Sequence, residues 1–98
     1  MFRNEALSNI VELEGNYYYI DSCYTFDHGY ETMIFPCDSN GNVTDWGELY
    51  AEWYEDRAAM EARHKEIVAD LKSTFENATE ENKSFLSRLI DALEKGNE

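Results

Sequence analysis

The sequence predicts an α+β domain, with a three- to four-stranded antiparallel sheet and two C-terminal helices packed on one face of that sheet. Two observations lead to this fold class. Short runs of alternating apolar and polar residues, separated by turn residues, fill the first half of the chain, and apolar residues recur at helical spacing in the second half. The length of 98 residues fits a single domain over 1–98, with its sheet over 10–54 and its helices over 56–75 and 79–95.

Three strands are expected in the first part of the sheet, over residues 10–14, 17–26 and 30–37. A Gly-Asn dipeptide follows the first run and is a strong two-residue hairpin signal. An Asp-His-Gly sequence follows the second run, where glycine supplies a backbone with positive φ. Turn-forming residues then dominate 38–42, so the third strand ends before that segment.

Residues 48–54 fit either a strand or a helix. Alternation places Leu49, Ala51 and Trp53 on one side of a strand. A helix is the alternative, because Asp45 and Glu48 have the spacing of a capping box and apolar residues recur at helical intervals beyond them. The aromatic content of the segment favours a strand.

Two helices are expected in the second half of the chain. Asp56 is a suitable N-cap for a helix over 56–75, and Thr79 is a suitable N-cap for a helix over 79–95, which Gly96 ends. The first helix has the apolar stripe Met60, His64, Ile67, Val68, Leu71 and Phe75, and the second has Phe85, Leu86, Leu89, Ile90 and Leu93.

The alternation also predicts which sheet residues the helices cover. The residues expected to face the helices are Val11, Leu13, Tyr18, Ile20, Met33, Phe35, Leu49, Ala51 and Trp53. No third layer is expected on the other face, which would be acidic and rich in tyrosine. We take the residues of that face as the predicted partner-binding site: Glu12, Glu14, Tyr17, Tyr19, Asp21, Glu48, Tyr50, Glu52 and Tyr54.

The charge balance indicates the kind of partner. The chain has 21 acidic and 8 basic residues, and its net charge is -13. This field repels phosphates, which excludes unaided binding to nucleic acid or to an anionic membrane, and it attracts basic surfaces. We therefore expect a protein partner with a basic surface. Two plainer interpretations stay open: the charge serves solubility, and the tyrosines stabilise an exposed sheet through cross-strand pairs.

No motif in the sequence predicts an enzyme, a metal site or a cofactor. His64 lies on a helical apolar stripe, where a histidine is usually a buried, hydrogen-bonded core residue. If the protein were nevertheless an enzyme, His64 would be the residue to test. Cys23 and Cys37 fall out of register in a hairpin centred near His28, so we expect two buried thiols rather than a disulfide. A zinc site at the cysteines and histidines would lack closely spaced ligand pairs.

The start of the chain lacks the basic residues and apolar run of a signal peptide, and no run is long enough for a membrane span, so a cytoplasmic location is expected.

Four segments, 28–36, 41–46, 49–54 and 59–64, covering about half the chain, resemble small acidic accessory proteins encoded by phages and prophages. The resemblance implies a strand before the first helix and a location in the host bacterial cell. It carries no catalytic residues.

Anti-CRISPR proteins are the best-known phage proteins of this size and acidity, and many occupy the nucleic-acid channel of a nuclease. By this analogy we expect a phage-encoded inhibitor that blocks the DNA or RNA site of an effector nuclease, with the CRISPR nucleases as the first candidates. The alternative is a phage regulatory or assembly protein that acts through self-association or a protein partner, as a monomer or a dimer.

Overall fold

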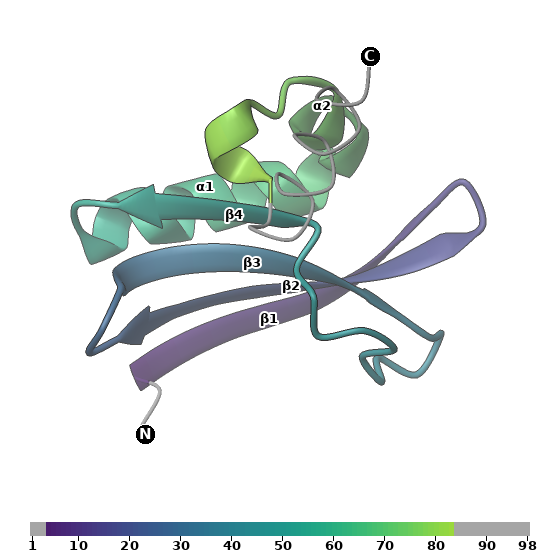
Figure 1. Ribbon diagram of the computed structural model, residues 1–98, viewed down its shortest axis with the longest axis horizontal. Helices are drawn as coiled ribbons and strands as arrows, with labels where there is room; N and C mark the ends of the chain where they lie inside the picture. Colours follow the sequence, from purple (N-terminus) through teal and green to yellow (C-terminus); the bar gives the residue numbers. More distant parts are fainter. Residues whose placement is uncertain (1–3, 84–98) are drawn as a thin grey trace, which may run out of the picture.

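The computed structural model describes residues 4–83 and shows four antiparallel strands on one side and two helices on the other (Figure 1). The elements are β1 (Asn4–Leu13), β2 (Asn16–Thr25), β3 (Gly29–Cys37), β4 (Tyr50–Tyr54), α1 (Arg57–Ala69), α2 (Leu71–Glu76) and the 3₁₀ helix η1 (Glu80–Asn82). The strands follow one another in the order β1-β2-β3-β4. The α+β fold and the packing of helices on the sheet are confirmed. No helix among the described residues is long and apolar enough to cross a membrane.

The strands are close to those predicted, with two differences. β1 begins at Asn4 rather than at residue 10, because β2 is long enough to pair with it as far as Tyr24. The first turn is Glu14-Gly15 rather than Gly15-Asn16, since Leu13 pairs with Asn16 and both turn residues have positive φ, 53° and 88°. The ambiguous segment 48–54 contains a strand, as favoured, and it pairs with β3.

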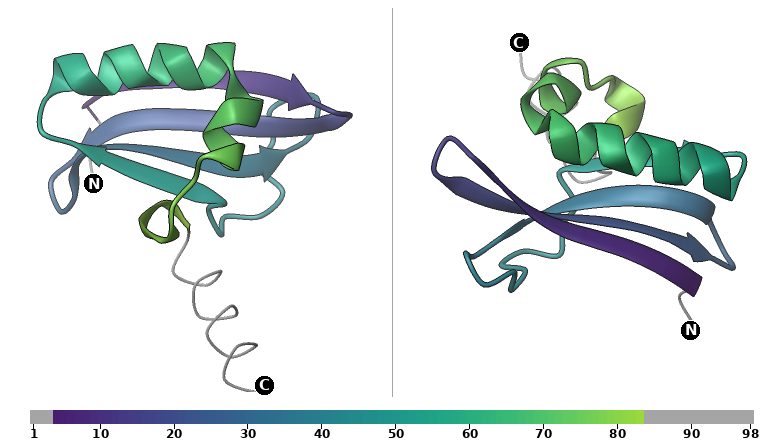
Figure 2. Two further views of the ribbon diagram at one scale, coloured as in Figure 1. Left: turned by 90° about the horizontal axis from the view of Figure 1, so that it is seen from above. Right: turned by 180° about the vertical axis from the view of Figure 1, so that it is seen from behind.

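The single helix predicted over 56–75 is interrupted at Asp70. Asp56 caps α1 as expected, accepting a hydrogen bond from the Ala59 amide at 2.8 Å. Asp70 has the non-helical angles φ -147° and ψ 70°, and its carboxylate accepts from the amide of Ser73 at 3.1 Å, so it ends α1 and caps α2. Figure 2 shows that α2 turns away from the axis of α1. Of the segment predicted as a helix over 79–95, only residues 80–82 are helical in the described part, as the 3₁₀ helix η1, which ends before the extended Lys83 at φ -75° and ψ 149°; 84–98 lie outside the described residues.

The core lies between the sheet and the helices. Ile20, Ile34 and Tyr50 are neighbours across β2, β3 and β4, and they pack against Ile67 of α1 and Leu71 of α2. Val11, Leu13 and Tyr18 flank this cluster, and the Tyr18 ring meets the Phe75 ring edge-on with centroids 5.2 Å apart. The predicted helix-facing residues of the first two strands are therefore confirmed.

The face predicted for the last two strands is wrong. Ile20 pairs with Ile34 and Ile34 with Tyr50, so the alternate residues point away from the helices. β3 has apolar residues on both faces, and its hydrophobic pattern therefore does not distinguish them. The residues that were expected to face the helices and do not are Met33, Phe35, Leu49, Ala51 and Trp53.

Candidate protein-binding surface

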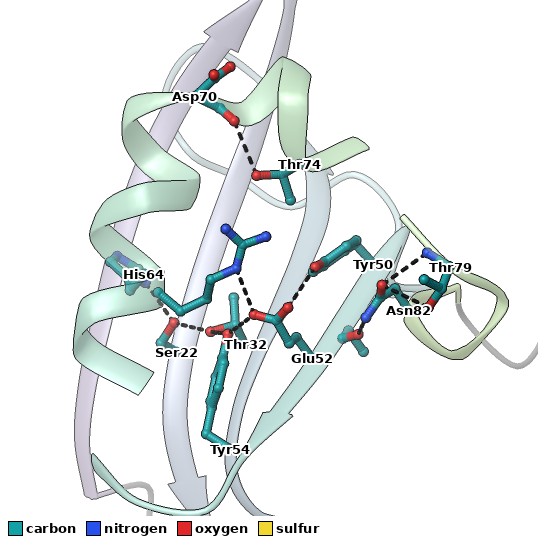
Figure 3. A network of polar contacts seen from close by, with 12 residues as sticks. Ser22, Thr32, Tyr50, Glu52, Tyr54, His64, Asp70, Thr74, Thr79 and Asn82 are labelled. Carbon is teal, nitrogen blue, oxygen red and sulfur yellow. Dashed lines mark hydrogen bonds and ion pairs between the residues drawn. The ribbon is translucent and has the colours of Figure 1, made fainter. Parts of the chain in front are cut away.

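Three residues of the predicted binding site, Tyr50, Glu52 and Tyr54, lie on the helix-covered side of the sheet, beside α1, instead of on the uncovered face, so that placement is wrong (Figure 3). Glu52 accepts hydrogen bonds from the Tyr50 and Tyr54 hydroxyls at 3.0 and 2.6 Å, and the Arg63 guanidinium of α1 pairs with it at 3.0 Å. Burial and these carboxylate contacts raise the pKa of both tyrosine hydroxyls. This cluster fastens β4 to α1.

His64 continues the polar layer beneath α1. Its Nε2 lies 2.7 Å from Oδ1 of Asn9 on β1, and its Nδ1 lies 2.6 Å from the Ser22 hydroxyl on β2. Because Asn9 Oδ1 is an acceptor, Nε2 carries the hydrogen and Nδ1 accepts from Ser22, which is the neutral imidazole. Ser22 in turn lies 2.5 Å from Thr32 Oγ1, and Thr32 Oγ1 lies 3.0 Å from the Tyr54 hydroxyl, whose one hydrogen is donated to Glu52.

The buried serine and histidine form a structural contact. Ser22 and Thr32 have no exposed surface, so a substrate cannot reach the Ser22 hydroxyl in this conformation. Burial lowers the pKa of His64, although the nearby charge of Asp21 opposes the shift. His64 is thus the buried, hydrogen-bonded core residue that the sequence predicts, and its bonds hold α1 over β1 and β2.

The sheet face away from the helices, called here the open face, combines apolar and aromatic residues with three acidic ones. It is formed by Ser8, Ile10, Glu12, Tyr17, Tyr19, Asp21, Cys23, Glu31, Met33, Phe35, Cys37, Ala51 and Trp53. Trp53 is 48% exposed and Ile10 is 46% exposed. Large apolar side chains are ordinarily withdrawn from water, so this exposure makes the open face a candidate contact surface.

The loop over 38–49 adds a partial third layer, which the sequence did not predict. Figure 1 shows it descending on the side away from the helices. Its Trp46 is 71% exposed and meets the buried Phe35 ring edge-on, with centroids 5.2 Å apart, and Leu49 is 42% exposed. Gly41, at φ 85°, lies so near Ile10 that a Cβ there would come within 2.5 Å of Ile10 Cδ1.

Asp38 fixes the shape of this loop. Its carboxylate accepts hydrogen bonds from the backbone amides of Asn40 and Asn42, both at 2.9 Å, and from the Asn42 side chain at 3.1 Å. These bonds favour the ionised carboxylate and lower the pKa of Asp38. Residues 38–42 of the loop therefore form an ordered turn.

The remaining predicted site residues divide between the open face and its margins. Glu12, Tyr17, Tyr19 and Asp21 lie on the open face, although Asp21 is buried. Glu14 is in the first turn with its carboxylate 3.6 Å from the Lys72 ammonium, and Glu48 is in the loop before β4. The residues that sequence reasoning missed are Ile10, Trp46, Leu49 and Trp53; a correct register for β4 would have found Leu49 and Trp53.

Other chemistry is not evident in the described part of the chain. No cluster of three or more His, Cys, Asp or Glu residues there could hold a metal ion. The two buried cysteines are not bridged, because Cys23 pairs with Glu31 and Cys37 with Tyr17 at opposite ends of the sheet. A polar cavity of about 210 Å³ lies at the junction of the helices and is lined by Arg63, Glu66, Asp70, Ser73, Thr74 and Asn77.

Comparison with known proteins gives no relative: no family model, no curated protein and no solved structure matches this chain.

Proposed function

We propose that this protein acts by binding a partner protein with a basic surface, through the open face and the adjoining loop over 38–49. The observation that carries the proposal is the exposure of Ile10, Trp46, Leu49 and Trp53 together on the side that the helices leave uncovered. Tryptophan is among the residues that most often dominate the energy of a protein interface. Monomeric proteins rarely expose several large apolar side chains on one face, and surfaces that do so are often interaction sites.

The charge of the chain supports a basic partner. The patch belongs to a molecule of net charge -13, and Glu12, Asp45 and Glu48 lie on or beside it. Opposite charges steer association and select the partner, whereas the apolar anchors supply most of the affinity. Binding is therefore expected to weaken as salt is added, with the larger effect on the association rate.

For the class of partner we propose an effector nuclease of bacterial defence, with the CRISPR nucleases as the first candidates. The protein would then be a phage-encoded inhibitor that covers the nuclease's DNA or RNA site. The support is the basic character of nucleic-acid sites, which complements the net charge of -13 of this chain. The alternative, a phage regulatory or assembly protein that self-associates, must overcome repulsion between two copies of charge -13.

The test is direct binding to a panel of purified CRISPR nucleases loaded with guide RNA. We expect the Trp53→Ala variant to lose about tenfold or more in affinity for a nuclease that binds the wild type. Phe26→Ala is the matched control, because Phe26 is 87% exposed but lies in the turn between β2 and β3. Target DNA should compete with the protein.

Each part of the proposal can fail separately. Unchanged affinity of Trp53→Ala, or equal losses in both variants, would show that another surface binds. Failure of every nuclease in the panel to bind would remove the proposed partner class, and sedimentation velocity would then show whether the protein associates with itself.

A further inference from the structure

The two edge strands of the sheet, β1 and β4, differ in length and in what lies against them. β4 has five residues, and η1 lies against it, with the Asn82 side chain donating to the backbone carbonyl of Ala51 at 3.1 Å. β1 has ten residues, and within 4–83 its only strand partner is β2. The outer backbone groups of an edge strand are a template for another strand.

β1 lacks most of the features that usually protect an edge. Its pairing with β2 is uninterrupted from Leu7 to Leu13, and the irregularity is confined to the segment between Asn4 and Leu7. The strand contains no lysine and no proline, the residues that commonly prevent strand addition. Ser8, Ile10 and Glu12 are exposed along it.

The edge is also held in place before any partner arrives. Asn9 of β1 is hydrogen-bonded to His64 of α1 at 2.7 Å, and the turn that follows β1 is tied to α2 by the pair of Glu14 and Lys72. A strand that is already ordered loses little conformational entropy on binding. β1 therefore offers a preformed row of donors and acceptors.

The negative charge around β1 favours a basic segment as the strand that adds to this edge. Residues 4–25, which make up β1, the first turn and β2, contain four acidic residues and no basic one. A second copy of the chain would bring the same acidic strand to the edge, whereas a basic segment would bring the complementary charge. The open face continues to the edge at Ile10 and Glu12, so alternate side chains of an added strand would extend that face.

We infer that β1 binds an extended basic segment of the partner by strand addition, with an apolar side chain beside Ile10 and a lysine or arginine beside Glu12. These two partner positions are two residues apart, which gives an apolar-x-basic pattern for a parallel strand and a basic-x-apolar pattern for an antiparallel one. The inference rests on the proposed function, since it names the part of the basic partner that the edge takes.

The probe is the nine-residue peptide Val-Thr-Lys-Thr-Val-Thr-Lys-Thr-Val, in which valine and lysine alternate along one face of the strand, and the comparison peptide has glutamate in place of each lysine. At a peptide concentration about ten times the measured Kd, we expect the amides of the edge in Leu7–Leu13 to exchange with solvent about tenfold more slowly. The Glu12→Lys variant should bind the lysine peptide at least about tenfold more weakly and gain affinity for the glutamate peptide. Glu81→Lys makes the same charge change on η1, at the opposite edge of the sheet, and should leave the protection unchanged.

The outcomes separate this inference from the proposed function. Strand addition is overturned if the lysine peptide does not protect β1, if both peptides protect it equally, or if β1 protection depends on protein concentration alone, which would indicate pairing of two copies. If in addition a nuclease binds in a manner sensitive to Trp53→Ala and insensitive to Glu12→Lys, the proposed function stands without the edge.

Discussion

His64 joins three elements through one side chain. Its ring connects α1 to Asn9 of β1 and Ser22 of β2, and its Nδ1 accepts the Ser22 hydrogen only while the imidazole is neutral. Protonation would make Nδ1 a donor, so Ser22 would have to turn its hydrogen toward Thr32. The whole row of hydroxyls beneath α1 is therefore coupled to the charge of one ring.

The first prediction is that acid destabilises the protein through His64. Burial lowers the folded pKa below the unfolded value of 6.5, so the unfolded chain takes up a proton first as the pH falls. The stability contributed by the neutral ring is complete above pH 6.5 and is lost as the pH falls from there through the folded pKa. Urea titrations at a series of pH values should show a steeper loss for the wild type than for His64→Gln. Parallel curves would contradict this prediction.

The buried polar cluster also explains why three candidate site residues were misplaced from the sequence. In β4, Tyr50, Glu52 and Tyr54 alternate with less polar residues, and a glutamate is ordinarily expected to face water. Here Arg63 on the facing helix supplies its counter-charge, and two tyrosines supply hydrogen bonds. Arg63 lies eleven residues beyond Glu52 in the sequence, so the alternation of residues within β4 does not indicate this counter-charge.

At the scale of elements, the break between the helices is set by Asp70. It lets α2 leave the axis of α1 and bring Phe75 against Tyr18. We predict that Asp70→Ala lowers the free energy of unfolding by about 1 kcal/mol, because the Ser73 amide loses its acceptor. Chemical denaturation measures the change.

The control for the Asp70 substitution is Asp27→Ala, which removes the same charge from an exposed turn. It should change the free energy of unfolding by less than about 0.5 kcal/mol. Equal effects of the two substitutions would show that charge, rather than the cap, determines the stability of this region.

The sequence predicted the number and order of the strands, and a helix after them, better than the faces of the strands and the break in that helix. Hairpin and cap signals are local, so the three hairpin strands, the strand before the helix and the cap at Asp56 could be found from neighbouring residues. Asp70 could have been found in the same way, from its spacing to Ser73. The faces of β3 and β4 could not be predicted in this way, because β3 has apolar residues on both faces and the packing of the helices determines which face is covered.

At the scale of the whole molecule, the net charge of -13 acts against folding. We predict that added salt stabilises the protein. Raising NaCl from about 10 mM to about 150 mM shortens the screening length from about 30 Å to about 8 Å, which weakens the repulsion among carboxylates. Thermal unfolding at both concentrations checks this prediction.

A variant with less charge provides the control for the salt experiment. Glu55, Glu76 and Glu81 are exposed, and their replacement by glutamine removes three negative charges. This variant should be more stable than the wild type at low salt and should gain less from added salt. A fall in the melting temperature with salt would instead show that ion pairs such as that of Arg63 with Glu52 outweigh the repulsion.

The order of the strands has a consequence for the synthesis of the protein. Each strand pairs with the strand before it in the sequence, and the sheet is complete at Tyr54, three residues before α1 begins. The longest connection within it is the loop over 38–49, so no distant part of the chain is required to pair the strands. A ribosome has therefore supplied every strand of the sheet before it adds the first residue of the helices that cover it.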